Sequence, residues 1–126
     1  MKKHLRYTWL SGLCLFVFTP VLWAHPPTDI KLSYDYSAKT LHIEMTHVTS
    51  NIVKHYIRRL EIVKNQDVPV TMTLPRQTTP HNLVEDVSLT AKPGDTIQVK
   101  AYSKEGGIAE QSFIVPPEDS KKKTNN

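Results

Sequence analysis

Apolar and polar residues alternate along most of the chain from about residue 30 onward, as they do in strands that bury one face. Turn-forming residues divide this pattern into seven candidate strands. They lie near residues 30–36, 41–47, 56–64, 68–74, 83–89, 97–101 and 109–115. No segment repeats apolar residues convincingly at helical spacing. The pattern predicts an all-β fold, an immunoglobulin-like β-sandwich of about seven strands.

Proline and glycine refine this prediction. Pro69 has no amide proton for a sheet ladder, which favours an edge position for the fourth strand. Lys92-Pro93-Gly94-Asp95 has proline and glycine in the order of a type II turn. Residues 25–117 are therefore expected to form one β-sandwich domain. The polar residues 118–126 are expected to form a disordered tail.

The first 24 residues carry a different pattern, in which a basic start is followed by an apolar stretch at residues 10–21. Ala24 provides the small residue that signal peptidase requires, so residues 1–24 are predicted to be a cleaved signal peptide. The alternative interpretation of residues 1–24 is a membrane anchor, but their apolar stretch is short for one. We expect a periplasmic or secreted protein with no membrane attachment after cleavage.

Cleavage changes the charge and removes the thiol. The whole chain has a formal charge of +4, and loss of Lys2, Lys3 and Arg6 would leave about +1. Residues 25–117 are balanced in charge, so nucleic-acid binding is not indicated. The single cysteine, Cys14, lies in the leader, which excludes disulfides and cysteine-ligated metals from the mature chain. The sequence also lacks the Gly-x-Ser-x-Gly motif of many hydrolases and a glycine-rich phosphate loop.

Histidine is the residue type that suggests chemistry, because imidazole is the commonest metal ligand in proteins. His47 ends the second predicted strand on its apolar face, and His55 begins the third after a short loop. His25 precedes the first strand, which a tight turn joins to the second, so His25 and His47 belong at the same end. We therefore expect a metal site of His25, His47 and His55. His42 and His81 are expected to face solvent.

Cleavage after Ala24 would also make His25 the amino terminus. The α-amine and the ring could then chelate one metal ion, because the amine loses its proton near neutrality when a metal displaces it. Pro26 and Pro27 have no amide protons, so the chelate could not continue through deprotonated backbone amides. The alternative is that a histidine follows the cleavage site by chance.

Two stretches of sequence resemble a known family. The first is His47 followed by His55-Tyr56-Ile57-x-x-Leu60-Glu61, and the second runs from Leu89 through Lys92-Pro93-Gly94-Asp95 to Ala101-Tyr102-Ser103. Both resemble superoxide reductase, the iron-binding domain of desulfoferrodoxin, over roughly residues 25–115. The resemblance implies an immunoglobulin-like sandwich whose iron is held by four histidines and an axial cysteine thiolate.

The resemblance assigns His47 and His55 to the two central histidines, with His25 as a possible counterpart of the first. The chain departs from the family at three positions. Val48 replaces a proline, Ser103 stands where the axial cysteine belongs, and Gly106 stands where the last histidine belongs. Because the thiolate donates charge to the iron, superoxide reduction is expected to be lost or much weakened.

Imidazole-rich sites without thiolate suit Cu(II), Zn(II) or Ni(II) at least as well as Fe(II), so the expected cofactor is an iron or copper ion. One hypothesis is therefore an exported metal-binding or metal-handling protein with a reduced, histidine-only site. The alternative is a metal-free periplasmic binding module or carrier-associated partner, an idea that rests on fold analogy. In that case His47 and His55 would be ordinary strand-end residues. A periplasmic protein partner is compatible with this alternative, and the sequence identifies neither that partner nor the oligomeric state.

Overall fold

The computed structural model describes residues 25–118, which form an all-β structure of seven strands. The strands are β1 (Thr28–Asp35), β2 (Thr40–Thr46), β3 (Ile57–Lys64), β4 (Val70–Thr73), β5 (Asn82–Ser88), β6 (Thr96–Ser103) and β7 (Ile108–Ile114). The expected signal peptide and all but the first residue of the expected tail lie outside the described residues. Within residues 25–118, no helix could cross a membrane.

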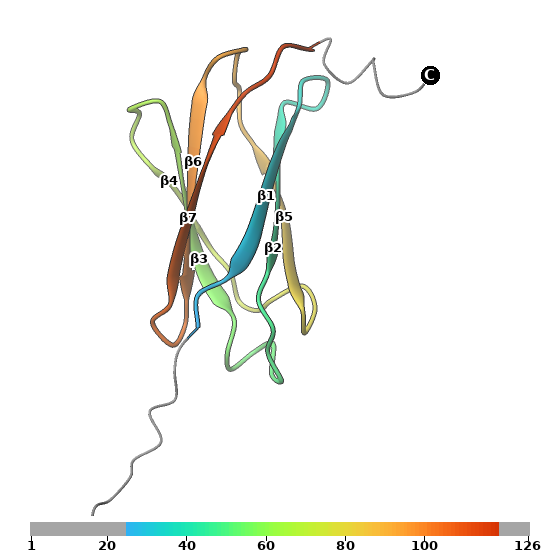
Figure 1. Ribbon diagram of the computed structural model, residues 1–126, viewed down its shortest axis with the longest axis vertical. Helices are drawn as coiled ribbons and strands as arrows, with labels where there is room; N and C mark the ends of the chain where they lie inside the picture. Colours follow the sequence, from blue (N-terminus) through green and yellow to red (C-terminus); the bar gives the residue numbers. More distant parts are fainter. Residues whose placement is uncertain (1–24, 119–126) are drawn as a thin grey trace, which may run out of the picture.

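The strands form two antiparallel sheets that face each other (Figure 1). One sheet has the order β1-β2-β5, and the other has the order β4-β3-β6-β7. This arrangement confirms the predicted β-sandwich. β4 lies at a sheet edge, as Pro69 led us to expect, but it begins at Val70 rather than at Val68. β4 is shorter than predicted because Pro69 cannot donate a hydrogen bond to the ladder. Val68, the residue before it, is 86% exposed.

The core forms where the apolar faces of the two sheets meet. In β2, Leu41, Ile43 and Met45 are fully buried, and the residues between them are only partly so. In β6, Ile97 and Val99 are likewise fully buried, as predicted. Burial of each such side chain contributes about 1.5–3 kcal/mol, which strongly fixes the register of both strands. The residue after β2 on this face is His47, so the core itself directs this imidazole inward.

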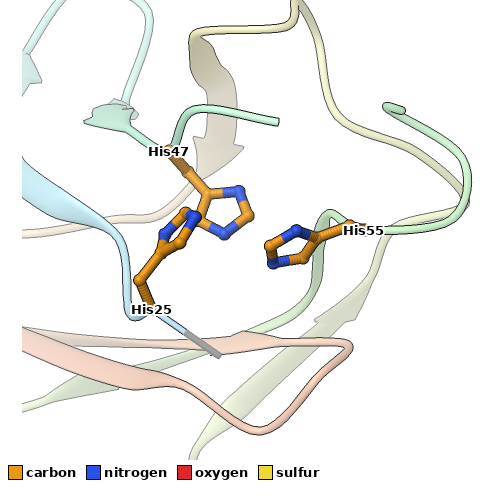
Figure 2. Close-up of side chains that lie close together, drawn as sticks. All are labelled: His25, His47 and His55. Atoms are coloured by element: carbon orange, nitrogen blue, oxygen red, sulfur yellow. The ribbon is translucent and has the colours of Figure 1, made fainter. Parts of the chain in front are cut away.

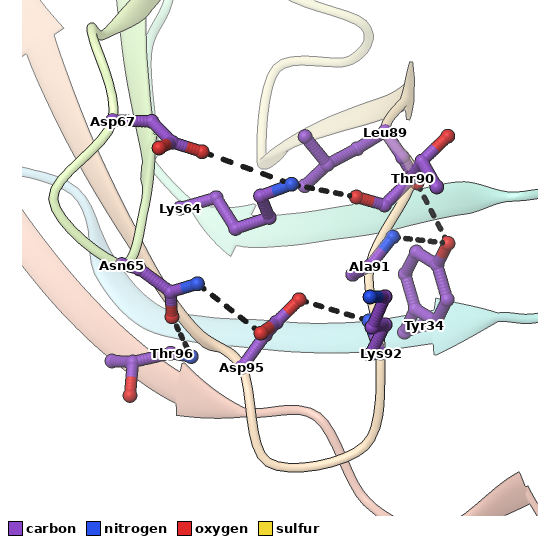
Figure 3. Close-up of polar contacts among 10 residues, drawn as sticks. All are labelled: Tyr34, Lys64, Asn65, Asp67, Leu89, Thr90, Ala91, Lys92, Asp95 and Thr96. Atoms are coloured by element: carbon purple, nitrogen blue, oxygen red, sulfur yellow. Dashed lines mark hydrogen bonds and ion pairs between the residues drawn. The ribbon is translucent and has the colours of Figure 1, made fainter.

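Polar contacts close one end of the sandwich (Figure 3). Asp95 accepts hydrogen bonds from the Lys92 backbone amide at 2.9 Å and from Asn65 Nδ2 at 3.1 Å. The Tyr34 hydroxyl donates to the Leu89 carbonyl at 2.7 Å. The bonds of Asn65 and Tyr34 tie the loop between β5 and β6 to the β3–β4 turn of one sheet and to β1 of the other. At the other end of the sandwich, the chain enters β1, leaves β2 and enters β3 (Figure 1). His25, His47 and His55 belong to these three segments.

Candidate metal site

His47 is placed by the strand pairing on both sides of it. It follows Thr46, the last residue of β2, and its backbone amide donates to the His81 carbonyl at 2.8 Å. This bond continues the pairing of β2 with β5 by one residue. The alternation of β2 then turns the imidazole into the end of the core, where His47 is 1% exposed. A polar ring buried this deeply requires partners for its nitrogens.

His25 reaches the same place through the register of β1. Thr28 pairs with Thr46 in the antiparallel ladder, so the residues before Thr28 run alongside those after Thr46. The ladder is irregular between Thr28 and Lys31, and Asp29 within this irregularity has a φ of 47°. The ladder does not continue before Thr28, where two prolines lack amide protons. His25 itself is exposed, at the rim of the site.

Gly107 leaves room for this N-terminal segment to lie against the turn between β6 and β7. A Cβ atom on Gly107 would lie 2.7 Å from the Pro26 backbone nitrogen and 2.8 Å from the His25 carbonyl carbon. Both are backbone atoms that could only move together with the segment. Any residue larger than glycine therefore displaces His25. A hydrogen bond ties this turn to β6, because the Ser103 amide donates to the Gly107 carbonyl at 2.8 Å.

His55 is positioned by a compact turn in the loop that leads to β3. The Asn51 side-chain oxygen accepts hydrogen bonds from the amides of Val53 at 3.2 Å and Lys54 at 3.1 Å. The Asn51 backbone carbonyl accepts from the His55 amide at 2.9 Å. Asparagine favours such turns because its short side chain bonds to backbone a few residues ahead. The turn brings His55, which is partly buried, back toward His47.

The three imidazoles meet as predicted (Figure 2). Ring centroids lie 4.9 Å apart for His25 and His47, 5.1 Å for His25 and His55, and 4.8 Å for His47 and His55. One nitrogen from each ring can be chosen so that all three lie within 4.8 Å of one another. Nitrogens bound to one tetrahedral ion at ordinary metal distances are about 3.3 Å apart. The widest gap would therefore close by about 1.5 Å around an ion.

Gln77 decides which nitrogen of His47 is free. Its Nε2 lies 2.6 Å from the His47 carbonyl and 2.9 Å from the Thr79 carbonyl, and carbonyls only accept hydrogen bonds. The amide oxygen must then face His47 Nδ1, which lies 2.7 Å away. Nδ1 therefore carries the ring proton, and Nε2 is left with a lone pair. That Nε2 is buried and has no hydrogen-bond partner among the described residues.

The environment of His47 favours the neutral form of its ring. Burial lowers its pKa below 6.5, although the hydrogen bond to Gln77 opposes this shift. The nearby His55 and His25 rings lower the pKa further, because a second positive charge beside them would be unfavourable. His55 resembles His47 in one respect, since its Nε2 is also buried without a partner within residues 25–118. A neutral imidazole with an unused lone pair is the form that binds a metal.

The two other histidines within residues 25–118 lie where the sequence indicated. His42 is partly exposed on β2, with Nδ1 2.6 Å from an Asp86 carboxylate oxygen, and His81 is exposed in the loop before β5. Neither belongs to the three-histidine cluster. Sequence reasoning missed Gln77 and Gly107. Gln77 is one polar residue in a polar loop, and only its long-range contact with His47 distinguishes it from its neighbours.

Ser103 and Gly106 occupy the two positions at which the resemblance expects a cysteine and a histidine. Ser103 ends β6 opposite Ile57 and is 2% exposed, and its Oγ has no hydrogen-bond partner in the described part of the chain. Gly106 lies in the turn after β6 with a φ of 103°. These positions therefore offer a neutral hydroxyl and no side chain. The donors of the cluster are imidazole nitrogens alone.

Comparison with solved structures finds superoxide reductase (neelaredoxin) from Ignicoccus hospitalis, at 14% sequence identity and a TM-score of 0.45. The alignment covers 75% of this chain and 81% of that chain. A variant of the same protein gives a TM-score of 0.46 at 14% identity with the same coverage. No family model and no curated protein matches the chain. The similarity is distant. What the site can bind depends on its own side chains.

Proposed function

We propose that the mature form of this chain is an exported protein that binds one transition-metal ion through His25, His47 and His55. The observation that carries the proposal is the state of His47, whose Nδ1 is bonded to Gln77 while its buried Nε2 has no partner among the described residues. An unpaired polar atom at such depth is costly, by about 1–3 kcal/mol. A metal ion shared with the two neighbouring rings would satisfy it.

The donor set favours copper. Three neutral imidazoles suit Cu(II), Zn(II), Ni(II) or Fe(II), and among divalent ions of this series Cu(II) binds nitrogen ligands most tightly. Iron remains the ion that the family resemblance implies. The thiolate that would tune iron for superoxide chemistry has no counterpart, because Ser103 holds a neutral hydroxyl. We therefore propose metal binding or handling in the periplasm or outside the cell, without superoxide reduction.

Export would complete the site chemically. Cleavage after Ala24 would convert the amide nitrogen of His25, which cannot bind a metal in its protonated form, into an α-amine that can. The amine and the His25 ring together would form a chelate, and Pro26 would stop further coordination along the backbone. The α-amine would be a fourth nitrogen ligand, and the precursor would lack it.

The first experiment titrates the mature protein, with its His25 amino terminus verified by mass spectrometry, with Cu(II) and separately with Zn(II). His47→Ala is expected to weaken binding by more than about 100-fold, beyond what outer-sphere substitutions usually cost. His42→Ala and His81→Ala are matched controls, because both histidines lie outside the cluster. Equal affinity in the parent and His47→Ala would rule out the site.

A second arm adds one glycine before His25. If the α-amine is a ligand, this extension should weaken Cu(II) binding by at least about tenfold while the three rings remain. Unchanged affinity would remove the amine from the ligand set.

Loading the protein with Fe(II) tests the predicted loss of superoxide reduction. We expect no superoxide consumption above that of the metal-free protein, and measurable turnover would contradict the predicted loss.

Elemental analysis of protein recovered from its natural compartment distinguishes the two functional hypotheses. Stoichiometric copper or iron supports the metal-binding proposal. A metal-free protein that also fails to bind added Cu(II) would instead support a binding module that uses only the sandwich scaffold.

A further inference from the structure

A cavity of about 330 Å³ lies beside the start of β3, apart from the three histidines. Its walls come from the first residues of β3, the end of β4 and the turn after β6. The lining residues are Tyr56, Arg58, Arg59, Thr73, Leu74 and Lys104. Backbone hydrogen bonds connect these walls, since the Lys104 amide donates to the Tyr56 carbonyl at 2.9 Å and the Leu74 amide donates to the Arg58 carbonyl at 2.8 Å.

The cavity carries uncompensated positive charge. Three of its lining residues are cationic and none is acidic. Arg59 is already neutralised, because its guanidinium lies 3.3 Å from Glu61 and stacks 3.9 Å above the Tyr102 ring. Arg58 and Lys104 form no ion pair with any residue from 25 to 118. Two positive charges therefore face the cavity without a protein counterion.

A break in the strand alternation brings both arginines to this surface. Ile57 and Leu60 are both fully buried, although residues three apart on a regular strand point to opposite faces. The ladder between β3 and β6 shifts register between Ile57 and Arg59, which accounts for the extra residue. Arg58 is exposed as a result rather than directed into the core. Bulges of this kind commonly re-aim side chains at binding surfaces.

Apart from the polar Thr73, the remaining walls are apolar or aromatic. Leu74 is 6% exposed, and the Tyr56 ring lies 5.3 Å from the Lys104 ammonium group. A ligand that fits must therefore offer a negative group to Arg58 and Lys104 and an apolar surface to Tyr56 and Leu74. A carboxylate meets the first need well, because a planar guanidinium can bind both of its oxygens. The volume is at the lower end of that of small-molecule sites.

We propose that this cavity binds a small organic carboxylate with a flat apolar body. The proposal is independent of the metal site, since no histidine of the cluster lines the cavity. Benzoate is the test ligand, and it is added to the ¹⁵N-labelled mature protein in the presence of a chelator. Saturable shifts of the Tyr56 and Lys104 amide signals are expected, with a dissociation constant in the range of about 0.1–10 mM.

Controls separate this site from general attraction to a cationic protein. Exchanging both cations for neutral residues, Arg58→Gln with Lys104→Gln, should weaken benzoate binding at least about tenfold. Lys31→Gln, which removes an exposed cation on β1, should leave binding unchanged. Benzamide, which has the same shape without the charge, should not bind measurably.

Three results would overturn the proposal. The first is the absence of saturable shifts with benzoate, and the second is equal binding by the double variant. The third is inorganic phosphate binding as tightly as benzoate, because the apolar wall would then contribute nothing. His47→Ala should bind benzoate like the parent protein, so failure of the metal site and failure of this cavity can be told apart.

Discussion

Gln77 offers the sharpest test of the proposal that the fold prepares His47 to bind a metal. Gln77→Met removes the amide from a fully buried position while approximately keeping the volume of the side chain. Without Gln77, no other described residue accepts a hydrogen bond from His47 Nδ1 and so keeps the ring proton on that nitrogen. The proton is then free to occupy Nε2, where it blocks the lone pair that a metal needs. Gln77→Met should therefore weaken both folding and metal binding.

The expected magnitudes follow from the three hydrogen bonds of the Gln77 side chain. The substitution leaves His47 Nδ1, the His47 carbonyl and the Thr79 carbonyl without their partner. Buried groups left unpaired cost about 1–3 kcal/mol each, and carbonyls tolerate the loss better than donors, so about 2–4 kcal/mol of stability should be lost. Metal affinity should fall about 10- to 100-fold, as it does when other outer-sphere partners are removed.

Gln77→Glu separates the two effects. A carboxyl oxygen still accepts the hydrogen bond from His47 Nδ1, while the donor that served the two carbonyls is lost. Its stability should fall about as far as that of Gln77→Met, but Cu(II) affinity should remain within about tenfold of the parent. Thermal unfolding of the metal-free protein gives the first quantity, and a competitive Cu(II) titration gives the second. The ¹⁵N shifts of the His47 ring report which nitrogen carries the proton.

Two outcomes would refute this reasoning. If Gln77→Met and Gln77→Glu lose metal affinity equally, the bond to Nδ1 is irrelevant and Gln77 only supports the loop. If the His47 ring of the parent carries its proton on Nε2, the amide does not select the tautomer at all.

Three further predictions concern the segments around the site and the opposite end of the sandwich. Gly107→Ala should displace the N-terminal segment and raise the Cu(II) dissociation constant toward that of His25→Ala, as measured by titration. Asn51→Ala should cost about 1 kcal/mol in thermal unfolding and weaken metal binding less than His55→Ala does, because the turn loosens but the ligand remains. Asp95 has a pKa held below 3.8, chiefly by its hydrogen bond from the Lys92 amide, so its contribution to stability is present above that value and is lost as the pH falls through the lowered pKa. Asp95→Asn should therefore lower the melting temperature at neutral pH, and the difference should shrink well below pH 3.8; a difference independent of pH would contradict this.

Alternation of apolar and polar residues determined the strands. Successive side chains of a strand point to opposite faces, so a strand that buries one face repeats its apolar residues with a period of two. That rule located all seven strands and placed His47 on the buried face while leaving His42 partly exposed. Where the rule failed, a local feature explains it. β4 is shorter because of Pro69, and Arg58 turns outward because of the register shift in β3.

The meeting of His25 with His47 was also predictable, since a tight turn between antiparallel strands places their far ends together. Tertiary structure alone decided that Gln77 fixes the tautomer of His47 across 30 residues of chain. It also decided that Gly107 leaves room for the N-terminal segment and that a cationic cavity opens beside β3. Periodicity describes which way a residue faces within its own strand. It contains no information about which loop folds over that residue, because loop contacts depend on the packing of all the strands together.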